Sequence, residues 1–464
     1  MRANLIARMR AGDEVFPGIV GFDRTVLPQI ENAILSGHDF ILLGLRGQAK
    51  TRLLRGLPAL LDEALPAVEG CEIHDDPLAP RCARCRRLLA ELGDALPVVW
   101  LSREDRYREK LATPDVTIAD LIGDVDPIKA AKKRLEFADP EVIHYGIVPR
   151  TNRGIFAINE LPDLSARIQV GLLNILEEGD IQIRGFPVRL PMDMCLVFSA
   201  NPEDYTNRGS IITPLRDRIA SQILTHYPRT LAEALRITDQ EAWVERPAAP
   251  RVLVPDYLRL AIEEVAFQAR KSDFVDQRSG VSARMSIALM ENVVSSAERR
   301  ALRSGSAGAV ARTADLWTAS SAISGKIELV YDGEREGVHK VALLLAGRAL
   351  KEVFDQRMPD AYAAGEQGAA YAATLGWFQT GRAVDVSDEL SDEELHARLA
   401  AIPGLELLAR GRLAETGAGV GELAAAMEFV LEGLHQSSLL ARQEIVGGFA
   451  YRDMLAEMAQ SLEG

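Results

Sequence analysis

The sequence lacks any long apolar run, and it is poor in both cysteine and aromatic residues. Only 4 cysteines and 6% aromatic residues occur among its 464 residues. No apolar stretch approaches the roughly 18 residues that a membrane span needs, and the first residues contain no apolar core of the length found in a signal peptide. We therefore expect a cytoplasmic protein without a membrane span, in a compartment where cysteines stay reduced.

Positive charge is also in short supply. The chain has 53 Lys and Arg residues against 67 Asp and Glu residues, which gives a formal net charge of -14. A domain that binds nucleic acid is normally basic, so nucleic acid is not an expected partner. Hydrophobic residues make up 47% of the chain, and at about 150 residues per domain the length suggests two or three domains.

Short β-rich runs alternate with helical stretches over the first half of the chain. Each of the clearest runs is almost continuously apolar, which is typical of strands buried on both faces of a parallel sheet. These runs are Phe40–Leu43, Val98–Leu101, Ile155–Ile158 and Cys195–Phe198. The pattern predicts an α/β domain over residues 1–235, in which a parallel sheet is wrapped by helices.

Long helical periodicity replaces this alternation from about residue 228. We predict an all-helical lid domain over residues 236–358. A Gly/Ala-rich stretch and an acidic segment come next. Residues 359–464 are therefore expected to form a linker and a small helical C-terminal module, whose last helix ends near Leu462.

A phosphate-binding loop is predicted directly after the strand at 40–43. Residues 44–51 read Gly-Leu-Arg-Gly-Gln-Ala-Lys-Thr and lead into a helical segment, which is the order that a P-loop requires. In such a loop, backbone N–H groups surround the β-phosphate, Lys50 reaches the β- and γ-phosphate oxygens, and the Thr51 hydroxyl ligates Mg²⁺. ATP and Mg²⁺ are the expected cofactors. The candidate nucleotide-binding residues of the loop are Gly44, Gly47, Gln48, Ala49, Lys50 and Thr51.

Ala49 departs from the P-loop motif, because the residue before the lysine is normally glycine. An alanine is tolerated there only where its φ stays negative or the loop shifts slightly. We expect this substitution to affect affinity rather than the binding mode. Taken alone, the loop could also be an ordinary glycine-containing turn between a strand and a helix.

Two further buried strands end in polar residues. The strand at 155–158 ends in Asn159 and Glu160, where a Walker B strand ends in Asp-Glu, so Glu160 is the candidate general base for the attacking water. Asn159 can bind a Mg²⁺-bound water but adds no negative charge, and we expect weaker metal binding and slow turnover. Asn201 follows the strand at 195–200 and is the candidate sensor of the γ-phosphate. The alternatives are a polar strand end that caps the next helix and a simple Asn-Pro turn.

In this order, the motifs resemble those of the AAA+ ATPases of the magnesium-chelatase I-subunit and MoxR clade. The resemblance covers roughly residues 14–355. The segment Phe16-Pro-Gly-Ile-Val-Gly is similar to the clade's N-terminal motif beside the adenine, which adds Val20 to the candidate nucleotide contacts. The segments that resemble the clade's Walker B strand, the insert before that strand and the inserted β-hairpin are 154–163, 121–148 and 181–190.

The resemblance also implies roles for two arginines. The segment Pro214-Leu-Arg-Asp-Arg-Ile is similar to a Leu-Leu-Asp-Arg-Phe pattern whose arginine reaches a neighbouring subunit's nucleotide. By this match Arg218 is the preferred arginine finger and Arg216 the alternate, which implies a homo-oligomeric ring, expected to be a hexamer. Arg284 resembles the sensor 2 arginine, which reaches from the lid to the γ-phosphate. Without the resemblance, each would be a solvated or ion-paired surface arginine.

Three of the four cysteines lie close together in the sequence. Cys71-x₂-His74 and Cys82-x₂-Cys85 offer three thiolates and one imidazole, which make a complete tetrahedral zinc set. We predict a structural zinc knuckle in an insert at about residues 70–90. The alternative is three reduced cysteines in a loop, with His74 in solvent. Ordinary magnesium-chelatase I subunits are not expected to carry this cluster, which suggests a side branch of the clade.

The resemblance implies an ATPase that assembles as a ring and remodels or activates a partner protein, expected to contain a von Willebrand factor A domain. No Asp-x-Ser-x-Ser motif of such a domain occurs in this chain, so the domain would belong to another polypeptide. Two alternatives stay open. One is the ATPase subunit of a magnesium or cobalt chelatase that inserts metal into a tetrapyrrole. The other is a σ54-type transcriptional activator, which would need a Gly-Ala-Phe-Thr-Gly-Ala loop and a DNA-binding helix-turn-helix that the sequence does not show.

Overall fold

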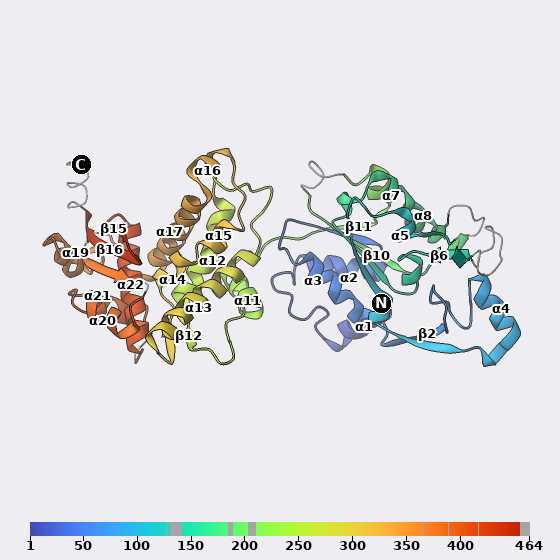
Figure 1. Ribbon diagram of the computed structural model, residues 1–464, viewed down its shortest axis with the longest axis horizontal. Helices are drawn as coiled ribbons and strands as arrows, with labels where there is room; N and C mark the ends of the chain where they lie inside the picture. Colours follow the sequence, from blue (N-terminus) through green and yellow to red (C-terminus); the bar gives the residue numbers. More distant parts are fainter. Residues whose placement is uncertain are drawn as a thin grey trace. The chain divides into compact units, whose positions relative to one another are not determined.

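The chain divides into two compact units, Met1–Tyr227 and Pro228–Gly464 (Figure 1). The computed structural model describes residues 1–126, 128–129, 142–183, 189–202, 210–363, 365–387, 389–415 and 417–454. The boundary between the units lies before residue 235, where the sequence pattern placed the end of the α/β domain. No helix within the described ranges is both long enough and apolar enough to cross a membrane.

A five-stranded parallel sheet forms the centre of the first unit. Its strands follow the order β11–β1–β10–β7–β4. They are β11 (Ser221–Leu224), β1 (Phe40–Leu43), β10 (Cys195–Ala200), β7 (Ile155–Asn159) and β4 (Tyr107–Leu111). The inner strands β10 and β7 are buried on both faces almost throughout, which explains why their sequences are continuous apolar runs.

Helices cover both faces of this sheet. Alternate side chains along a strand point to opposite faces, so Phe40 and Leu42 belong to one apolar layer and Ile41 to the other. The first layer includes residues of α1 (Arg2–Ala11), α2 (Val26–Ser36) and α3 (Lys50–Gly56). The second includes residues of α5 (Ile118–Leu121), α7 (Ala166–Gly171), α8 (Leu173–Glu178) and α10 (Thr213–Arg218). The structure confirms the α/β fold class expected from the sequence.

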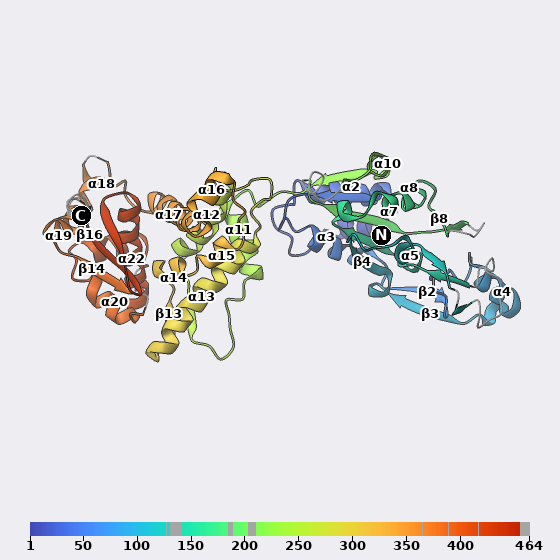
Figure 2. The same ribbon diagram turned by 45° about the horizontal axis from the view of Figure 1, so that its top comes forward.

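The apolar run at 98–101 is not a strand of the central sheet, so that expectation was wrong. It forms β3 (Val98–Ser102), which pairs antiparallel with β2 (Ala64–Val68) in a separate ribbon. Figure 2 shows the ribbon in light blue, with α4 (Ala83–Leu92) beyond its end. Trp100 is 66% exposed. The outer place in the sheet belongs to β4, with the sequence Tyr-Arg-Glu-Lys-Leu. An edge strand has one open side, so it tolerates charged residues.

The first unit also contains short antiparallel strand pairs outside the central sheet. The expected hairpin at 181–190 is formed by β8 (Asp180–Gln182) and β9 (Arg189–Pro191), although residues 184–188 lie outside the described residues. Within the expected insert at 121–148, β5 (Gly123–Val125) pairs with β6 (Ile143–Tyr145). Residues 127 and 130–141 of that insert also lie outside the described residues.

Long amphipathic helices build the second unit around one continuous core. The longest are α12 (Asp256–Lys271), α13 (Arg284–Ser304), α17 (Val338–Arg357) and α22 (Val420–Gln436). Helix α12 packs against both α13 and α17 (Figure 1). The ring of Phe429 lies 4.6 Å from that of Tyr257 and 6.3 Å from that of Phe354. The expected lid and the expected C-terminal module therefore share this core.

Shorter helices complete the second unit. They are α11 (Leu231–Glu241), α14 (Thr313–Thr318), α15 (Ser321–Ser324), α16 (Tyr331–Glu336), α18 (Glu366–Ala369), α19 (Ala372–Gln379), α20 (Asp392–Leu399) and α21 (Leu405–Arg412). Helices α11 and α20 each begin with a capping box, at Thr230 and Ser391. The helix that was expected to end near Leu462 falls on residues 455–464, outside the described residues.

The second unit also contains two small sheets, which corrects the expectation of purely helical parts. β14 (Val384–Ser387), β16 (Gly448–Asp453) and β15 (Leu440–Ile445) form an antiparallel sheet in that order. β12 (Arg251–Leu253) pairs parallel with β13 (Gly308–Val310). β12 and β13 have only three residues each, and burial along β15 and β16 does not alternate from residue to residue, so no period of two is visible between the long helices. The one local signal was Gly447, whose φ of 74° allows the tight turn between β15 and β16.

The exposure of β3 predicts an asymmetric effect of two aromatic-to-alanine substitutions. Phe156 is fully buried in β7, so Phe156→Ala should destabilise the protein by about 3–5 kcal/mol. Trp100→Ala should change stability by no more than about 0.5 kcal/mol, because the side chain remains in water. Urea unfolding followed by circular dichroism would measure both. A cost for Trp100→Ala comparable to that for Phe156→Ala would show that β3 belongs to a core.

Candidate functional site

Four parallel strands of the central sheet end side by side, and we call this side of the sheet its carboxyl end. Leu43 of β1 pairs with Ala200 of β10 and with Leu224 of β11, and Ile158 of β7 pairs with Phe198 of β10. The strand order also reverses beside β1, and ligands of open α/β sheets bind at such a place. The residues that gather here at the strand ends are Gly44, Asn159, Glu160, Asn201 and Thr225.

The loop between β1 and α3 is closed by hydrogen bonds from the neighbouring strand ends. The N–H of Gly44 donates to the carbonyl of Ala200 at 3.1 Å, and the Thr225 hydroxyl donates to Gln48 Oε1 at 2.7 Å. A Cβ at position 44 would lie 1.9 Å from Thr225 Oγ1 and 2.2 Å from Gln48 Oε1. Only glycine fits there, so the sequence signature of the loop has a steric cause.

Lys50 is the first residue of α3 and its side chain bends back over the loop. It is buried, and its ammonium group donates to the carbonyl oxygens of Gly44 and, at 3.0 Å, Leu45. A phosphate oxygen would take the place of these acceptors. Thr51 follows on the first turn of α3 and is partly buried. The loop therefore combines the ammonium and hydroxyl groups that the sequence assigned to phosphate and Mg²⁺.

Ala49 keeps the backbone shape that a glycine would have. Its φ is 55° and its ψ is 13°, and Gly47 also lies in the left-handed region with φ of 72°. The condition that φ stays negative at Ala49 is therefore not met. An L-residue with a Cβ pays roughly 1–2 kcal/mol to adopt this conformation. The alanine leaves the loop in a left-handed shape and adds local strain.

Asn159 at the end of β7 is fixed by hydrogen bonds on both sides of its amide. Its Oδ1 accepts from the Ser199 hydroxyl at 2.8 Å, and its Nδ2 donates to Glu109 Oε1 at 2.6 Å. The amide orientation follows from this network, since only the nitrogen can donate to a carboxylate. A side chain that carries both a donor and an acceptor suits this position.

Glu109 is a residue that the sequence analysis missed. It lies on β4, beside β7, and Arg55 of α3 donates to both of its carboxylate oxygens, at 2.8 and 3.2 Å. Burial raises the pKa of Glu109, but the hydrogen bonds from Arg55 and Asn159 and the Arg55 charge outweigh it and hold the pKa below its ordinary value. The negative charge missing from Asn159 is therefore present on the neighbouring strand. Its only sequence signal was a charged residue in an unpredicted edge strand.

Glu160 directly follows β7 and Asn201 directly follows β10, both at the carboxyl end of the sheet. Glu160 has φ of 54° and ψ of 49° and precedes the short helix η6 (Leu161–Asp163). A non-glycine residue in this left-handed conformation is uncommon and is found disproportionately at functional sites. Asn201 is buried directly after β10. Both lie where the sequence predicted a base and a sensor.

The remaining candidate residues lie elsewhere. Arg218 ends α10 and forms an ion pair with Glu177 of α8, with 2.6 Å between Nη2 and Oε2, while Arg216 is exposed. This pair is the surface role that the sequence left open. Arg284 is exposed at the start of α13 in the second unit. Val20 is buried in the segment between α1 and α2.

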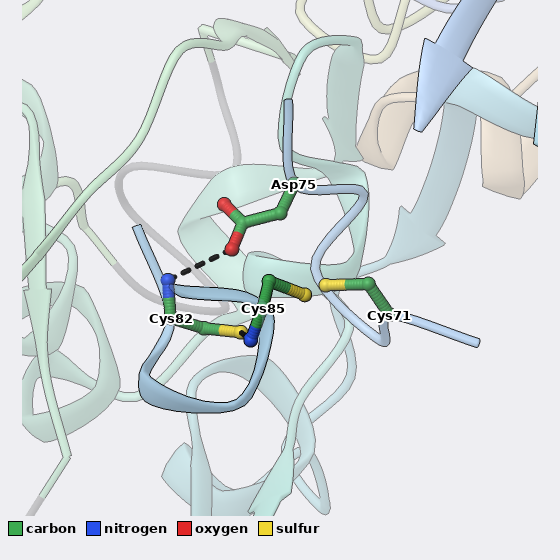
Figure 3. A group of neighbouring side chains, drawn as sticks. All are labelled: Cys71, Asp75, Cys82 and Cys85. Carbon is green, nitrogen blue, oxygen red and sulfur yellow. Dashed lines mark hydrogen bonds between the residues drawn. The ribbon is translucent and has the colours of Figure 1, made fainter. Parts of the chain in front are cut away.

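The cysteines of the insert come together, but His74 is not among them. One ligand atom from each of Cys71, Asp75, Cys82 and Cys85 lies within 4.8 Å of the others (Figure 3). His74 has φ of 51°, and its Nδ1 is buried without a hydrogen-bond partner in the described part of the chain. Sequence spacing favoured His74, but the left-handed backbone at that residue turns the next side chain, that of Asp75, toward the thiols.

The three thiols also shift one another's protonation. Hydrogen bonds from the Cys82 and Cys85 thiols stabilise the Cys71 thiolate and lower the pKa of Cys71. The same hydrogen bonds to Cys71 raise the pKa values of Cys82 and Cys85.

Comparison with known proteins gives limited sequence similarity. No family model matches the chain. A stretch of 98 residues is 31% identical to the hydrogenase transcriptional regulatory protein HoxA of Cupriavidus necator. This stretch is 21% of the chain and 20% of that protein, so the chain spans only about a fifth of this curated relative.

Solved structures that are similar to the chain have low TM-scores. A complex of the magnesium chelatase subunits BchI and BchD gives a TM-score of 0.36 at 21% identity, covering 69% of this chain and 98% of that one. A RuvB variant from Thermotoga maritima gives 0.38 at 13% identity, covering 95% and 96%. NtrX from Brucella abortus in complex with ATP gives 0.36 at 14% identity, covering 63% and 53%. These scores are too low to carry an argument about function, which therefore rests on the residues of this chain.

The contact between Asn159 and Glu109 predicts that restoring aspartate at position 159 is unfavourable by itself. Asn159→Asp would place two carboxylates in hydrogen-bond contact, which raises the pKa of one of them and should destabilise the protein by about 1–3 kcal/mol. Combining it with Glu109→Gln restores a donor opposite the new carboxylate and should recover at least about half of that loss. Urea unfolding of the two single variants and the double variant measures the coupling.

Asn292→Asp is a suitable control, because it adds the same charge at an exposed position of α13. We expect it to change stability by less than about 0.5 kcal/mol. Strictly additive effects of the substitutions at 109 and 159 would contradict the interpretation of this contact.

Proposed function

We propose that this chain is an ATPase of the AAA+ kind, with its nucleotide site at residues 44–51. The observation that supports this proposal most directly is that the candidate residues gather at the carboxyl end of the sheet. The loop that holds Lys50, the buried Asn159 beside Glu109, and the two strand-end residues Glu160 and Asn201 all gather there. Separately, each motif has an ordinary structural explanation. Together they supply the groups that bind a nucleoside triphosphate and activate a water molecule.

In the proposed reaction, each of these side chains has one task. The Lys50 ammonium binds phosphate oxygens, and Thr51 provides a hydroxyl ligand for Mg²⁺. Glu160 accepts a proton from the attacking water, and Asn201 orients that water. Asn159 would hold a water of the Mg²⁺ ion through its amide, and Glu109 fixes the position of that amide. The altered residues Ala49 and Asn159 support slow turnover.

The proposed assembly is a homo-oligomeric ring, expected to be a hexamer. Arg218, with Arg216 as the alternate, would act on the nucleotide of the next subunit, and Arg284 would report the nucleotide state from the helical lid at 236–358. Exposed ion pairs contribute only about 0–1 kcal/mol, so exchanging Glu177 for a phosphate costs Arg218 little. A ring of this kind would remodel a cytoplasmic partner, for which we propose a protein with a von Willebrand factor A domain. Zinc at the cysteine cluster is a further proposed cofactor, beside ATP and Mg²⁺.

The alternative in the same class is an ATPase subunit of a magnesium or cobalt chelatase. Both functions use the same nucleotide site, so only the identity of the partner separates them. A transcriptional activator of the σ54 type is the less favoured alternative, because the loop that contacts the sigma factor does not occur in the sequence. The short similarity to HoxA does not outweigh that absence.

Two substitutions separate nucleotide binding from hydrolysis. Lys50→Ala should abolish ATP binding, because it removes the cation that reaches the phosphates. Glu160→Gln should retain binding but lower the rate of ATP hydrolysis by about 10²–10⁴-fold, because it removes the base. Fluorescent-nucleotide titration and steady-state phosphate release measure the two properties.

Lys340→Ala and Glu336→Gln are matched controls, since these residues pair with each other on the surface of the second unit. Neither control should alter binding or hydrolysis. If wild type hydrolyses ATP no faster than Glu160→Gln, the catalytic proposal fails and a nucleotide-gated scaffold replaces it.

The proposed ring predicts complementation between two inactive variants. Arg218→Ala and Glu160→Gln should each be inactive alone. In an equal mixture, roughly a quarter of neighbouring pairs combine an intact base with an intact finger, so about a quarter of the wild-type rate should return. Size-exclusion chromatography establishes co-assembly, and Arg216→Ala serves as the parallel variant. Co-assembled mixtures that stay inactive with both arginine variants would disprove a finger acting in trans.

A further inference from the structure

Four potential metal ligands converge in the segment 71–85 of the first unit. The thiols of Cys71, Cys82 and Cys85 and the carboxylate of Asp75 each place one ligand atom within 4.8 Å of the others. Figure 3 shows the four side chains. In a tetrahedral zinc site with Zn–S distances of about 2.3 Å, the sulfur atoms lie roughly 3.8 Å apart. Side-chain adjustments of about 1 Å would therefore be enough to complete such a site.

Asp75 provides an independent sign that a cation belongs here. It is only 1% exposed. Its Oδ2 accepts a hydrogen bond from the N–H of Cys82 at 2.8 Å, whereas its Oδ1 is buried and has no hydrogen-bond partner among the described residues. A buried carboxylate oxygen without a donor is unfavourable unless a cation pairs with it. A metal ion held among the thiols would give this oxygen a partner once rotation about the Cβ–Cγ bond of Asp75 turns it toward the thiols.

The backbone around the thiols suits negatively charged sulfur. Cys82 caps the N-terminus of α4, and its Sγ accepts a hydrogen bond from the N–H of Cys85 at 3.3 Å. Cys82 and Cys85 are both buried. Backbone N–H groups that point at a cysteine sulfur stabilise the thiolate, the form that binds metal.

The apolar core around this segment is small. Its buried members in the described part of the chain are Val68, Ile73, Cys82, Cys85 and Leu96. Structures with so little apolar burial commonly depend on a disulfide or a structural metal. A metal would link the two ends of the loop, at Cys71 and at the start of α4.

We propose that Cys71, Asp75, Cys82 and Cys85 bind one Zn²⁺ ion in a closed tetrahedral site. Asp75 takes the fourth position, which the sequence spacing assigned to His74. Three soft thiolates in a tetrahedral set favour zinc over the hard cations Mg²⁺ and Ca²⁺. Four protein ligands leave no position for a water or substrate, so the ion has a structural role. This proposal stands independently of the proposed ATPase activity.

The site would stabilise the loop at 71–85. This loop contacts the chain just before β7, which in turn contacts the chain just before β10. Asn152, shortly before β7, donates from Nδ2 to the carbonyl of Ile73 at 2.9 Å. Its Oδ1 accepts from the N–H of Asp193, shortly before β10, at 2.8 Å. Glu72 forms ion pairs with Lys129 and Arg150 at 2.9 and 3.0 Å. Hydrogen bonds and ion pairs therefore connect the loop at 71–85 to the segments that lead into β7 and β10.

Metal analysis of the full chain, purified without chelator or added metal, is the first test. We expect about one zinc ion per chain, bound tightly enough to survive purification. Thiol titration of the folded protein should find Cys71, Cys82 and Cys85 unreactive until a chelator removes the zinc. Less than about half an equivalent of zinc after incubation with Zn²⁺, or a disulfide between these cysteines, would overturn the proposal.

Paired variants identify the fourth ligand. Asp75→Asn keeps the size of the side chain but removes its charge, and it should weaken zinc binding at least about 100-fold in competition with a chromophoric chelator. His74→Gln is the matched control at the adjacent residue and should stay within about two-fold of wild type. Co²⁺ absorption of the wild-type protein gives a second readout, which should show tetrahedral thiolate coordination.

Two outcomes would overturn the assignment of Asp75. Zinc that is lost with His74→Gln and retained with Asp75→Asn would return the fourth position to the histidine. Zinc that both variants retain at wild-type affinity would mean that neither side chain is a ligand. Cys82→Ser should abolish zinc binding, and retention of zinc in that variant would exclude the thiol site altogether.

Discussion

The parallel register of β1, β10 and β7 is the constraint on which the rest of the first unit depends. Because Leu43 lies opposite Ala200 and Ile158 opposite Phe198, the residues after these strands meet in space although they are far apart in the chain. A shift of one residue would exchange the side chains of a strand between the two apolar layers, and both closely packed layers would then have to repack. The hydrophobic core thus determines the geometry of the polar site.

At the carboxyl end of the sheet, Asn159 stands where a Walker B strand has aspartate, and its neighbours match the hydrogen-bonding groups of an amide. Asn159 donates to Glu109 and accepts from Ser199, so an aspartate at this position would lack a donor on one side and face a like charge. Arg55 in turn neutralises Glu109 from α3. The asparagine, the glutamate and the arginine form one arrangement, in which the carboxylate lies on β4 and is paired with Arg55.

The cysteine segment, residues 71–85, is held together mainly by polar contacts and not by an apolar core. Its apolar cluster is small, yet the charged side chain of Asp75 is almost completely buried, which is unusual for a surface loop. Hydrogen bonds from Asn152 and ion pairs of Glu72 tie the segment to the chain before β7. The proposed zinc ion would account for both the burial of Asp75 and the convergence of the thiols.

Local patterns in the sequence determined the buried strands, the glycine-containing loop at 44–51 and the polar residues at the strand ends, because each depends on neighbours within a few positions. Only the tertiary structure decided which strand fills the outer place in the sheet, because the run at 98–101 has the higher strand propensity and yet pairs with β2, whereas the charged run at 107–111 pairs with β7. It also decided that Glu109 lies beside Asn159 and that Asp75, rather than His74, faces the thiols. These last contacts depend on strand pairing and on one left-handed residue, His74, and neither leaves a regular pattern in the sequence.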